Sequence, residues 1–240
     1  MLEIKIANYI LIHGAWHGAW CWNKVKDLLE SNGHKVICPD LYDIDIPLEK
    51  IQLQDYVNYI ENIINLQESE PIIVGHSMAG IILSCLGSNS LNKIKSLVYL
   101  TAFILNEGES ILDISNRYYN PNVELEFSDD AKLCTIKKEQ AEYLFYNKCN
   151  KKDIEYATTL LKPQPYKIFE TKLSLNKGNF NKLPKYYIKC TDDNIVPLAA
   201  QKYMIKSQNL NEIFSIDTDH SPFLSSTINL FRILNKISNH

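Results

Sequence analysis

Several features that mark membrane, secreted and nucleic-acid-binding proteins are missing from this sequence of 240 residues. No apolar run approaches the roughly 18 residues that are needed to cross a bilayer. The net charge is −3, from 25 basic and 28 acidic residues, so no broad basic field exists to hold nucleic acid or an anionic membrane. The start, MLEIKIANYILIHG, has an early acid and no basic stretch, and we therefore expect no secretory signal.

The six cysteines lack the C-x-x-C spacing and any other spacing typical of metal ligands. Several of them fall inside apolar segments that read as strands or helices, such as Cys38 and Cys190. This placement favours buried free thiols in a reducing compartment over disulfides. We therefore expect a cytoplasmic protein with no metal site.

The sequence has the composition of a globular domain, with 45% hydrophobic and 22% charged residues. Short apolar runs alternate with segments of helical periodicity, which predicts an α/β fold with a mainly parallel sheet covered on both faces. The expected strands are 9–12, 34–38, 72–74, 96–100, 186–190 and 213–216, and the expected helices are 19–31, 53–66, one from Met78, 198–207 and 227–237.

The alternation breaks from about Leu105 to about Asn181. This stretch holds few runs that read as strands, many tyrosines, and helical patterns at 139–148 and 153–161. The simplest division has an α/β core formed by 1–104 and 181–240, with a helical cap inserted at 105–180.

The stretch PIIVGHSMAG, residues 71–80, places Ser77 at the joint between an apolar strand and an apolar helix. Small neighbours, Gly75 and Ala79, allow a sharp turn in which the hydroxyl stands out in a strained conformation. Ligands of open parallel sheets bind beyond the carboxyl ends of the strands. Ser77 is therefore a candidate nucleophile, in a G-x-S-x-G pattern whose last glycine is replaced by Ala79.

A serine hydroxyl needs a base and a third group that orients the base. His220, in DHSPFLS, follows the last expected strand, and Asp193, in TDDNIVP, follows the strand before it. The order Ser77, Asp193, His220 is that of the α/β hydrolases. Asp192 is adjacent to Asp193; the register of the motif favours Asp193, and the two substitutions to asparagine would decide between them.

An oxyanion hole needs two backbone amides. Met78, directly after the nucleophile, would supply one, and Ala15, in the loop after the first strand, would supply the other. His13 and His17 in this loop could be active-site groups, although a role in fixing the loop is favoured, and His76 is expected to be structural. His34, directly after a turn glycine, is expected at the surface.

With these residues in place, the chain resembles the α/β-hydrolase family, and more narrowly the group of methyl-salicylate-type esterases, hydroxynitrile lyases and bacterial esterase relatives. The matching stretches are LIHGAWHGAWCWNKVKDLLESNGHKV, IIVGHSMAG, YLTAF, YIKCTDDNIVP and DHSPFLS. The resemblance implies a helical cap and the triad and amides named above. The similar lyases carry a threonine at the position of Gly14 and a lysine at that of Ser221, and these departures favour ester hydrolysis.

We therefore expect a serine hydrolase, a carboxylesterase that acts on small to medium carboxylic esters and needs no cofactor. Other chemistry on the same fold stays open: a hydroxynitrile lyase, thioesterase, lactonase or acyltransferase, or a low-turnover ligand receptor. Cap residues such as Tyr118, Tyr119, Tyr143 and Phe145 would decide among these chemistries. The expected partner is a small-molecule ester, with neither nucleic acid nor membrane, and a homodimer is left open.

Overall fold

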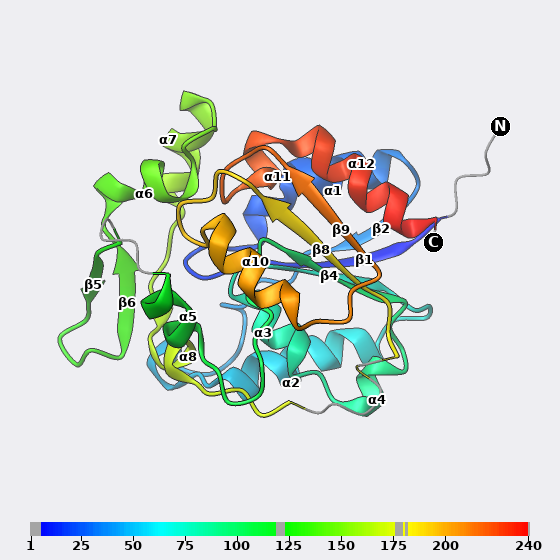
Figure 1. Ribbon diagram of the computed structural model, residues 1–240, viewed down its shortest axis with the longest axis horizontal. Helices are drawn as coiled ribbons and strands as arrows, with labels where there is room; N and C mark the ends of the chain where they lie inside the picture. Colours follow the sequence, from blue (N-terminus) through cyan, green and yellow to red (C-terminus); the bar gives the residue numbers. More distant parts are fainter. Residues whose placement is uncertain (1–5, 119–122, 176–179, 181, 240) are drawn as a thin grey trace.

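A six-stranded parallel sheet in the order β2-β1-β3-β4-β8-β9 forms the centre of the protein (Figure 1). The computed structural model describes residues 6–118, 123–175, 180 and 182–239. Because all neighbouring strands of the central sheet are parallel, the predicted α/β fold with a mainly parallel sheet is confirmed. The strands are β1 Asn8–Ile12, β2 Lys35–Ile37, β3 Ile72–His76, β4 Ser96–Leu100, β8 Lys185–Cys190 and β9 Glu212–Ile216.

Helices cover both faces of this sheet (Figure 1). One face carries α1 (Asn23–Ser31), α11 (Pro222–Ser225) and α12 (Thr227–Ser238), and the other carries α2 (Leu53–Asn65), α3 (Ala79–Ser84) and α4 (Ser88–Leu91). Helix α10 (Leu198–Lys206) packs beside β8. In the part of the chain that the structure describes, no helix has the length and apolar character that a membrane span requires.

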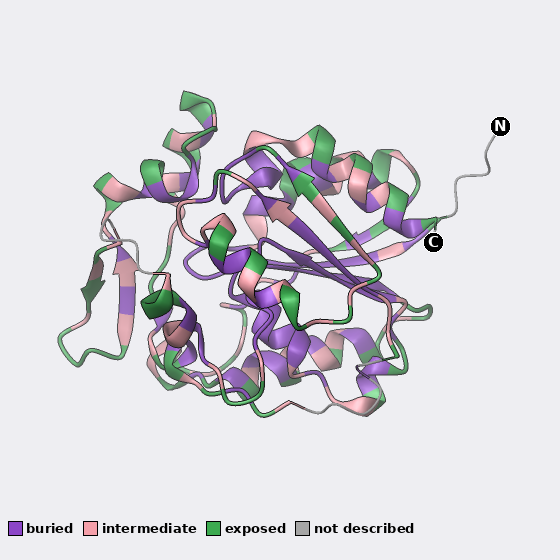
Figure 2. Cartoon of the chain, in the orientation of Figure 1, coloured by how far each residue is buried: buried purple, intermediate pink, exposed green. Residues whose placement is uncertain are grey.

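The central strands β3 and β4 are buried along their whole length (Figure 2). Coverage on both faces explains why these strands read as continuous apolar runs and not as alternating ones. Helix α2 shows the complementary pattern, because Tyr56, Val57, Ile60 and Ile64 are buried at helical spacing while the residues between them face outward. Each element therefore has the periodicity that its surroundings require.

The chain between β4 and β8 contains helices and also a second, antiparallel sheet in the order β5-β6-β7. The insertion, which we expected to be helical with few strands, thus also contains three strands of 3, 4 and 2 residues, and these are too short to be recognised by their periodicity. The elements of the insertion are α5 Ile111–Arg117, β5 Leu125–Phe127, β6 Leu133–Ile136, α6 Lys138–Phe145, α7 Lys151–Thr159, β7 Gln164–Pro165 and α8 Lys167–Glu170.

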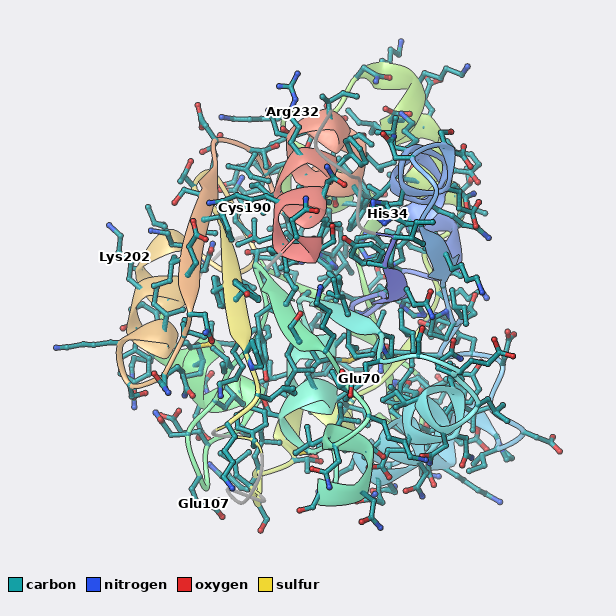
Figure 3. The ribbon with its side chains drawn as sticks, turned by 90° about the vertical axis from the view of Figure 1, so that its right-hand side faces the viewer. His34, Glu70, Glu107, Cys190, Lys202 and Arg232 are labelled. Atoms are coloured by element: carbon teal, nitrogen blue, oxygen red, sulfur yellow. The ribbon has the colours of Figure 1, made fainter. Side chains whose placement is uncertain are left out.

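His34 is buried, so its expected position at the surface was wrong (Figure 3). Its Nδ1 accepts a hydrogen bond of 3.1 Å from the amide of Ala7, and its Nε2 lies 3.0 Å from Oδ1 of Asn235 in α12. The turn glycine before it was the only local guide. A helix two hundred residues further along the chain covers the histidine, and the local sequence gives no sign of that helix.

Candidate active site

Ser77 occupies the turn between β3, which ends at His76, and α3, which begins at Ala79. Its φ angle of 54° lies in a region that residues other than glycine rarely adopt, so the turn is strained. The end of β4 holds the turn in place, because the Ser77 amide donates to Leu100 O at 3.2 Å and the Phe103 amide donates to Ser77 O at 3.0 Å. The expected sharp turn at this serine is confirmed.

Two glycines bring backbone segments close to this turn. A Cβ atom at Gly80 would lie 2.4 Å from the carbonyl oxygen of Phe103, so only glycine lets α3 pack this tightly on the chain after β4. A Cβ atom at Gly14 would lie 2.7 Å from Cβ of Ser77 and 2.9 Å from Nδ1 of His76. The loop after β1 therefore approaches the serine directly.

His220 and Asp193 form a buried pair, with 2.7 Å between Nδ1 of the histidine and Oδ2 of the carboxylate. Oδ2 also accepts a hydrogen bond of 2.6 Å from the hydroxyl of Thr101, and Oδ1 accepts 2.8 Å bonds from the amides of Ile195 and Val196. These bonds fix the carboxylate, which in turn holds the proton of the imidazole on Nδ1. Nε2 is then the ring nitrogen that can take up a further proton.

The neighbouring carboxylate, Asp192, has a different environment. Its side chain is 51% exposed and lies 3.2 Å from Nζ of Lys148, away from the imidazole. Sequence reasoning did not identify Thr101 as part of this site, although it stands directly after β4 within the stretch YLTAF. A polar residue at the end of a central strand was the available signal.

His76, the residue before Ser77, contacts His220. Nε2 of His76 donates to the carbonyl oxygen of His220 at 2.8 Å, and the two rings lie 4.6 Å apart. Among the described residues, no hydrogen bond joins the Ser77 hydroxyl to the His220 imidazole; such bonds often tighten only when substrate binds. Burial lowers the pKa of His76 well below its ordinary value, so this histidine stays neutral.

The loop after β1 is fixed by its own histidines. Nδ1 of His13 donates to Gly14 O at 2.8 Å, and its Nε2 accepts from the Leu41 amide at 2.9 Å. Nδ1 of His17 donates to Ala15 O at 2.9 Å. Burial lowers the pKa of His17 to about 3, so it is neutral in this position. Both contacts agree with the favoured role of these histidines, which is to shape the loop that presents Ala15.

A cavity of about 250 Å³ opens above Ser77. Its wall is mainly apolar, and the described residues that line it include no charged side chain. The lining residues are Ala15, Trp16, Ser77, Met78, Phe103, Ile111, Leu112, Ser115, Asn116, Tyr118, Val123, Leu125, Tyr166, Phe169 and Ile195. Ser77, the two residues expected to supply the oxyanion amides and residues of the insertion thus line one cavity.

The tyrosines and phenylalanine expected to decide the chemistry have different positions. Tyr118 lines the cavity, and Phe145 packs against the rings of Trp16 and His220 at 5.8 Å each. Tyr143 is 47% exposed, and Tyr119 lies outside the described residues. Across the ranges that the structure describes, no three His, Cys, Asp or Glu side chains gather into a group suited to a metal ion.

Comparison with known proteins agrees with this architecture. A model of the family described as "Alpha/beta hydrolase family" matches residues 9–229. Norfluorocurarine synthase 2 from a Strychnos species is 30% identical over 254 residues, which cover 96% of this chain and 95% of that protein. Methylesterase 2 of Arabidopsis thaliana is 29% identical over 242 residues, with 92% of this chain and 91% of the relative covered.

Some relatives are longer. The chain spans 65%, 59% and 56% of three Arabidopsis thaliana proteins that carry the names methylesterase 11, 15 and 13, each marked chloroplastic. Among solved structures, a pyrethroid hydrolase from Sphingobium faniae JZ-2 superposes with a TM-score of 0.86 at 24% identity, with 98% of each chain covered. This likeness shows a shared fold.

Proposed function

We propose that this chain, which belongs to the α/β hydrolase family, is a serine hydrolase that cleaves carboxylic esters through an acyl-enzyme on Ser77. The proposal is carried by the buried 2.7 Å pair of His220 and Asp193 together with a strained serine that lines a cavity. The names of the relatives, which include several methylesterases, support the same class of reaction.

In this proposal, Ser77 Oγ forms a bond with the carbonyl carbon of the ester while its proton passes to Nε2 of His220. The tetrahedral intermediate then collapses, the bond to the alcohol oxygen breaks, and His220 returns the proton to the leaving alcohol. A water molecule repeats the sequence on the acyl-enzyme and releases the acid. Asp193 holds the imidazole in orientation and stabilises its charged form at each step.

The amides of Met78 and Ala15 would stabilise the negative charge that develops on the carbonyl oxygen. Met78 precedes the first residue of α3, and Ala15 follows Gly14, whose backbone lies close to Ser77. The loss of one such donor typically costs about 10²–10³ in rate. Because the donors belong to the backbone, the position of the Ala15 amide depends on the two histidines that hold the first loop, His13 and His17.

The cavity points to the class of ester. Its volume of about 250 Å³ is small for a ligand site, and its lining carries no charged side chain among the described residues. We therefore propose uncharged, apolar acyl groups of small to medium size. Gly14 and Ser221 stand where the similar lyases carry threonine and lysine. A β-carbon placed at Gly14 would lie 2.7 Å from Cβ of Ser77, so this structure leaves no room for it.

Hydrolysis of p-nitrophenyl esters from acetate to octanoate tests the function, with Ser77→Ala as the matched variant. We expect turnover by the wild type and a loss of about 10⁴-fold or more in the variant, because the nucleophile is removed. A fluorophosphonate probe should label the wild type only. Ligand-induced thermal stabilisation without turnover or labelling would contradict the proposal and favour a receptor.

We also propose a cytoplasmic location, supported by the six cysteines, which are all free and lie buried or partly buried. The tagged full-length protein should be recovered in the cytosolic fraction of its own cells. Recovery in an organelle fraction, as the names of the chloroplastic relatives suggest for those proteins, would overturn this part of the proposal.

A further inference from the structure

Segment 143–149 runs from the last turn of α6 into the connection before α7 and contacts three separate loops of the core. These loops follow β1, β8 and β9, and they carry Ala15, Asp193 and His220. We propose that segment 143–149 is a positioning clamp that sets the three loops relative to one another, with Tyr146 and Asp219 as its principal positioning residues. The inference rests on the proposed function of these loops.

The first contact joins Tyr146 to the loop after β1. Nδ1 of His17 faces the carbonyl oxygen of Ala15, which can only accept, so Nδ1 carries the proton. Nε2 of His17 must then accept the hydrogen bond of 2.9 Å from the Tyr146 hydroxyl. Both side chains are buried, and burial raises the pKa of Tyr146 well above its ordinary value, so the phenol keeps the proton that it donates.

The second contact joins the segment to the loop that carries His220. Asp219, the residue before it, is completely buried, and its Oδ2 accepts a hydrogen bond of 2.8 Å from the backbone amide of Lys148. Its Oδ1 accepts from the amide of Ser221 at 3.0 Å and from the hydroxyl of Ser225. One carboxylate therefore bonds the segment on one side and two residues that follow His220 on the other.

The third contact reaches the loop that carries Asp193. Nδ2 of Asn194 donates to the backbone oxygen of Tyr143 at 2.8 Å. Nζ of Lys148 lies 3.2 Å from Asp192 and 2.9 Å from Asp217, and so bridges the loops after β8 and β9. Both of these carboxylates are more than half exposed, so we expect the ion pairs to contribute little compared with the buried bonds.

Tyr146→Phe removes one hydroxyl and keeps the ring that packs against Phe145 at 5.7 Å. His17 Nε2 would then be a buried acceptor without its donor, and the Ala15 carbonyl group, to which His17 donates, would lose the support behind it. A shift of this carbonyl group also moves the neighbouring Ala15 amide. A displaced Ala15 amide weakens an interaction made chiefly in the transition state. We therefore expect kcat to fall by about tenfold while KM stays within about twofold. Asp219→Asn should act similarly through the His220 loop, because an amide cannot accept at both of its terminal atoms.

The test uses the full-length chain and compares wild type, Tyr146→Phe and Asp219→Asn with the control Tyr156→Phe. The control loses the same hydroxyl from a tyrosine of α7 that is 49% exposed. Steady-state hydrolysis of p-nitrophenyl butyrate gives kcat and KM, and hydrogen–deuterium exchange reports on residues 13–18 and 217–221. We expect faster exchange in the loop that each variant releases, unchanged exchange in β3 and β4, and no change in the control.

If hydrogen–deuterium exchange in residues 13–18 and 217–221 matches the wild type in both variants, the proposed clamp is overturned. This result does not depend on whether the protein hydrolyses esters, because the exchange measurement needs no turnover. Faster exchange with unchanged kcat, or a change confined to KM, overturns the positioning role. If the wild type neither turns over esters nor accepts the fluorophosphonate, the proposed function fails by itself and exchange still decides about the clamp. If Asp219→Asn does not fold, Tyr146→Phe alone decides.

Discussion

The turn around Ser77 and the insertion between β4 and β8 differ in how firmly their residues are held. Every residue from Ile72 to Ser84 is buried, and the turn is bonded to the end of β4. The insertion is built from short elements and exposes large side chains, including Phe127 at 48% and Tyr156 at 49% (Figure 2). The proposed chemistry therefore lies on the rigid region, and the cavity wall comes largely from the less buried one.

The difference between the buried turn around Ser77 and the more exposed insertion has a physical reason. A nucleophile and its base must stay within a fraction of an ångström of a productive geometry, which close packing provides. A wall that selects among acyl groups only has to change in shape and size. Segment 143–149 belongs to the insertion, but its bonds also reach back to the loops of the core.

The sharpest test compares two adjacent carboxylates in the loop after β8. We expect Asp193→Asn to lower kcat by about 10⁴-fold, because the imidazole loses the partner that holds its tautomer. Asp192→Asn should stay within about threefold, since this half-exposed side chain makes surface contacts only. Ester hydrolysis by the two purified variants checks both values. The reverse result would assign the acid to Asp192 and overturn the proposed triad.

Acid should destabilise the fold because two histidines, His17 in the loop after β1 and His76 at the end of β3, are buried and neutral. The pKa of His17 is lowered to about 3, and that of His76 is also lowered, in both cases chiefly by burial. A histidine with a depressed pKa in the folded state stabilises the fold above its unfolded value of about 6.5, and this contribution is lost as pH falls towards the folded value.

At about pH 5, the linkage for His17 alone amounts to about 2 kcal/mol of lost stability relative to about pH 7. Denaturant melts at the two pH values measure this change in the free energy of unfolding. His17→Asn, which can still donate to Ala15 O, should show a smaller loss, and equal losses in variant and wild type would contradict the assignment.

The smallest effect is expected from the cavity wall. Phe169 lies in α8 of the insertion and lines the cavity. Phe169→Ala enlarges the cavity without touching the proposed triad, so we expect the preference for octanoate over acetate esters to rise by about threefold. The ratio of kcat/KM values for the two p-nitrophenyl esters measures it. A comparable loss on all esters would show that the insertion also supports the chemistry.

Much of the core could be predicted from local patterns. Strands at 9–12, 72–74 and 96–100 were expected and fall within β1, β3 and β4, because strands covered on both faces must be apolar throughout. Ser77 could be found because a sharp turn between a strand and a helix demands small neighbours, as Gly80 shows by its contact with Phe103.

The remaining features depend on contacts between residues far apart in the chain. No periodicity or local motif predicts the short strands of the insertion, the burial of His34 under α12 or the bond of Tyr146 to His17. A polar residue after β4 was a local signal for Thr101, but its bond to Asp193 joins residues far apart in the chain. The sequence by itself determined the parallel sheet and the candidate nucleophile and base, since these follow from local periodicity and turn chemistry. Only the tertiary structure decided which carboxylate meets the imidazole, what shapes the cavity and which segment joins the three loops, because these depend on distances that folding alone creates.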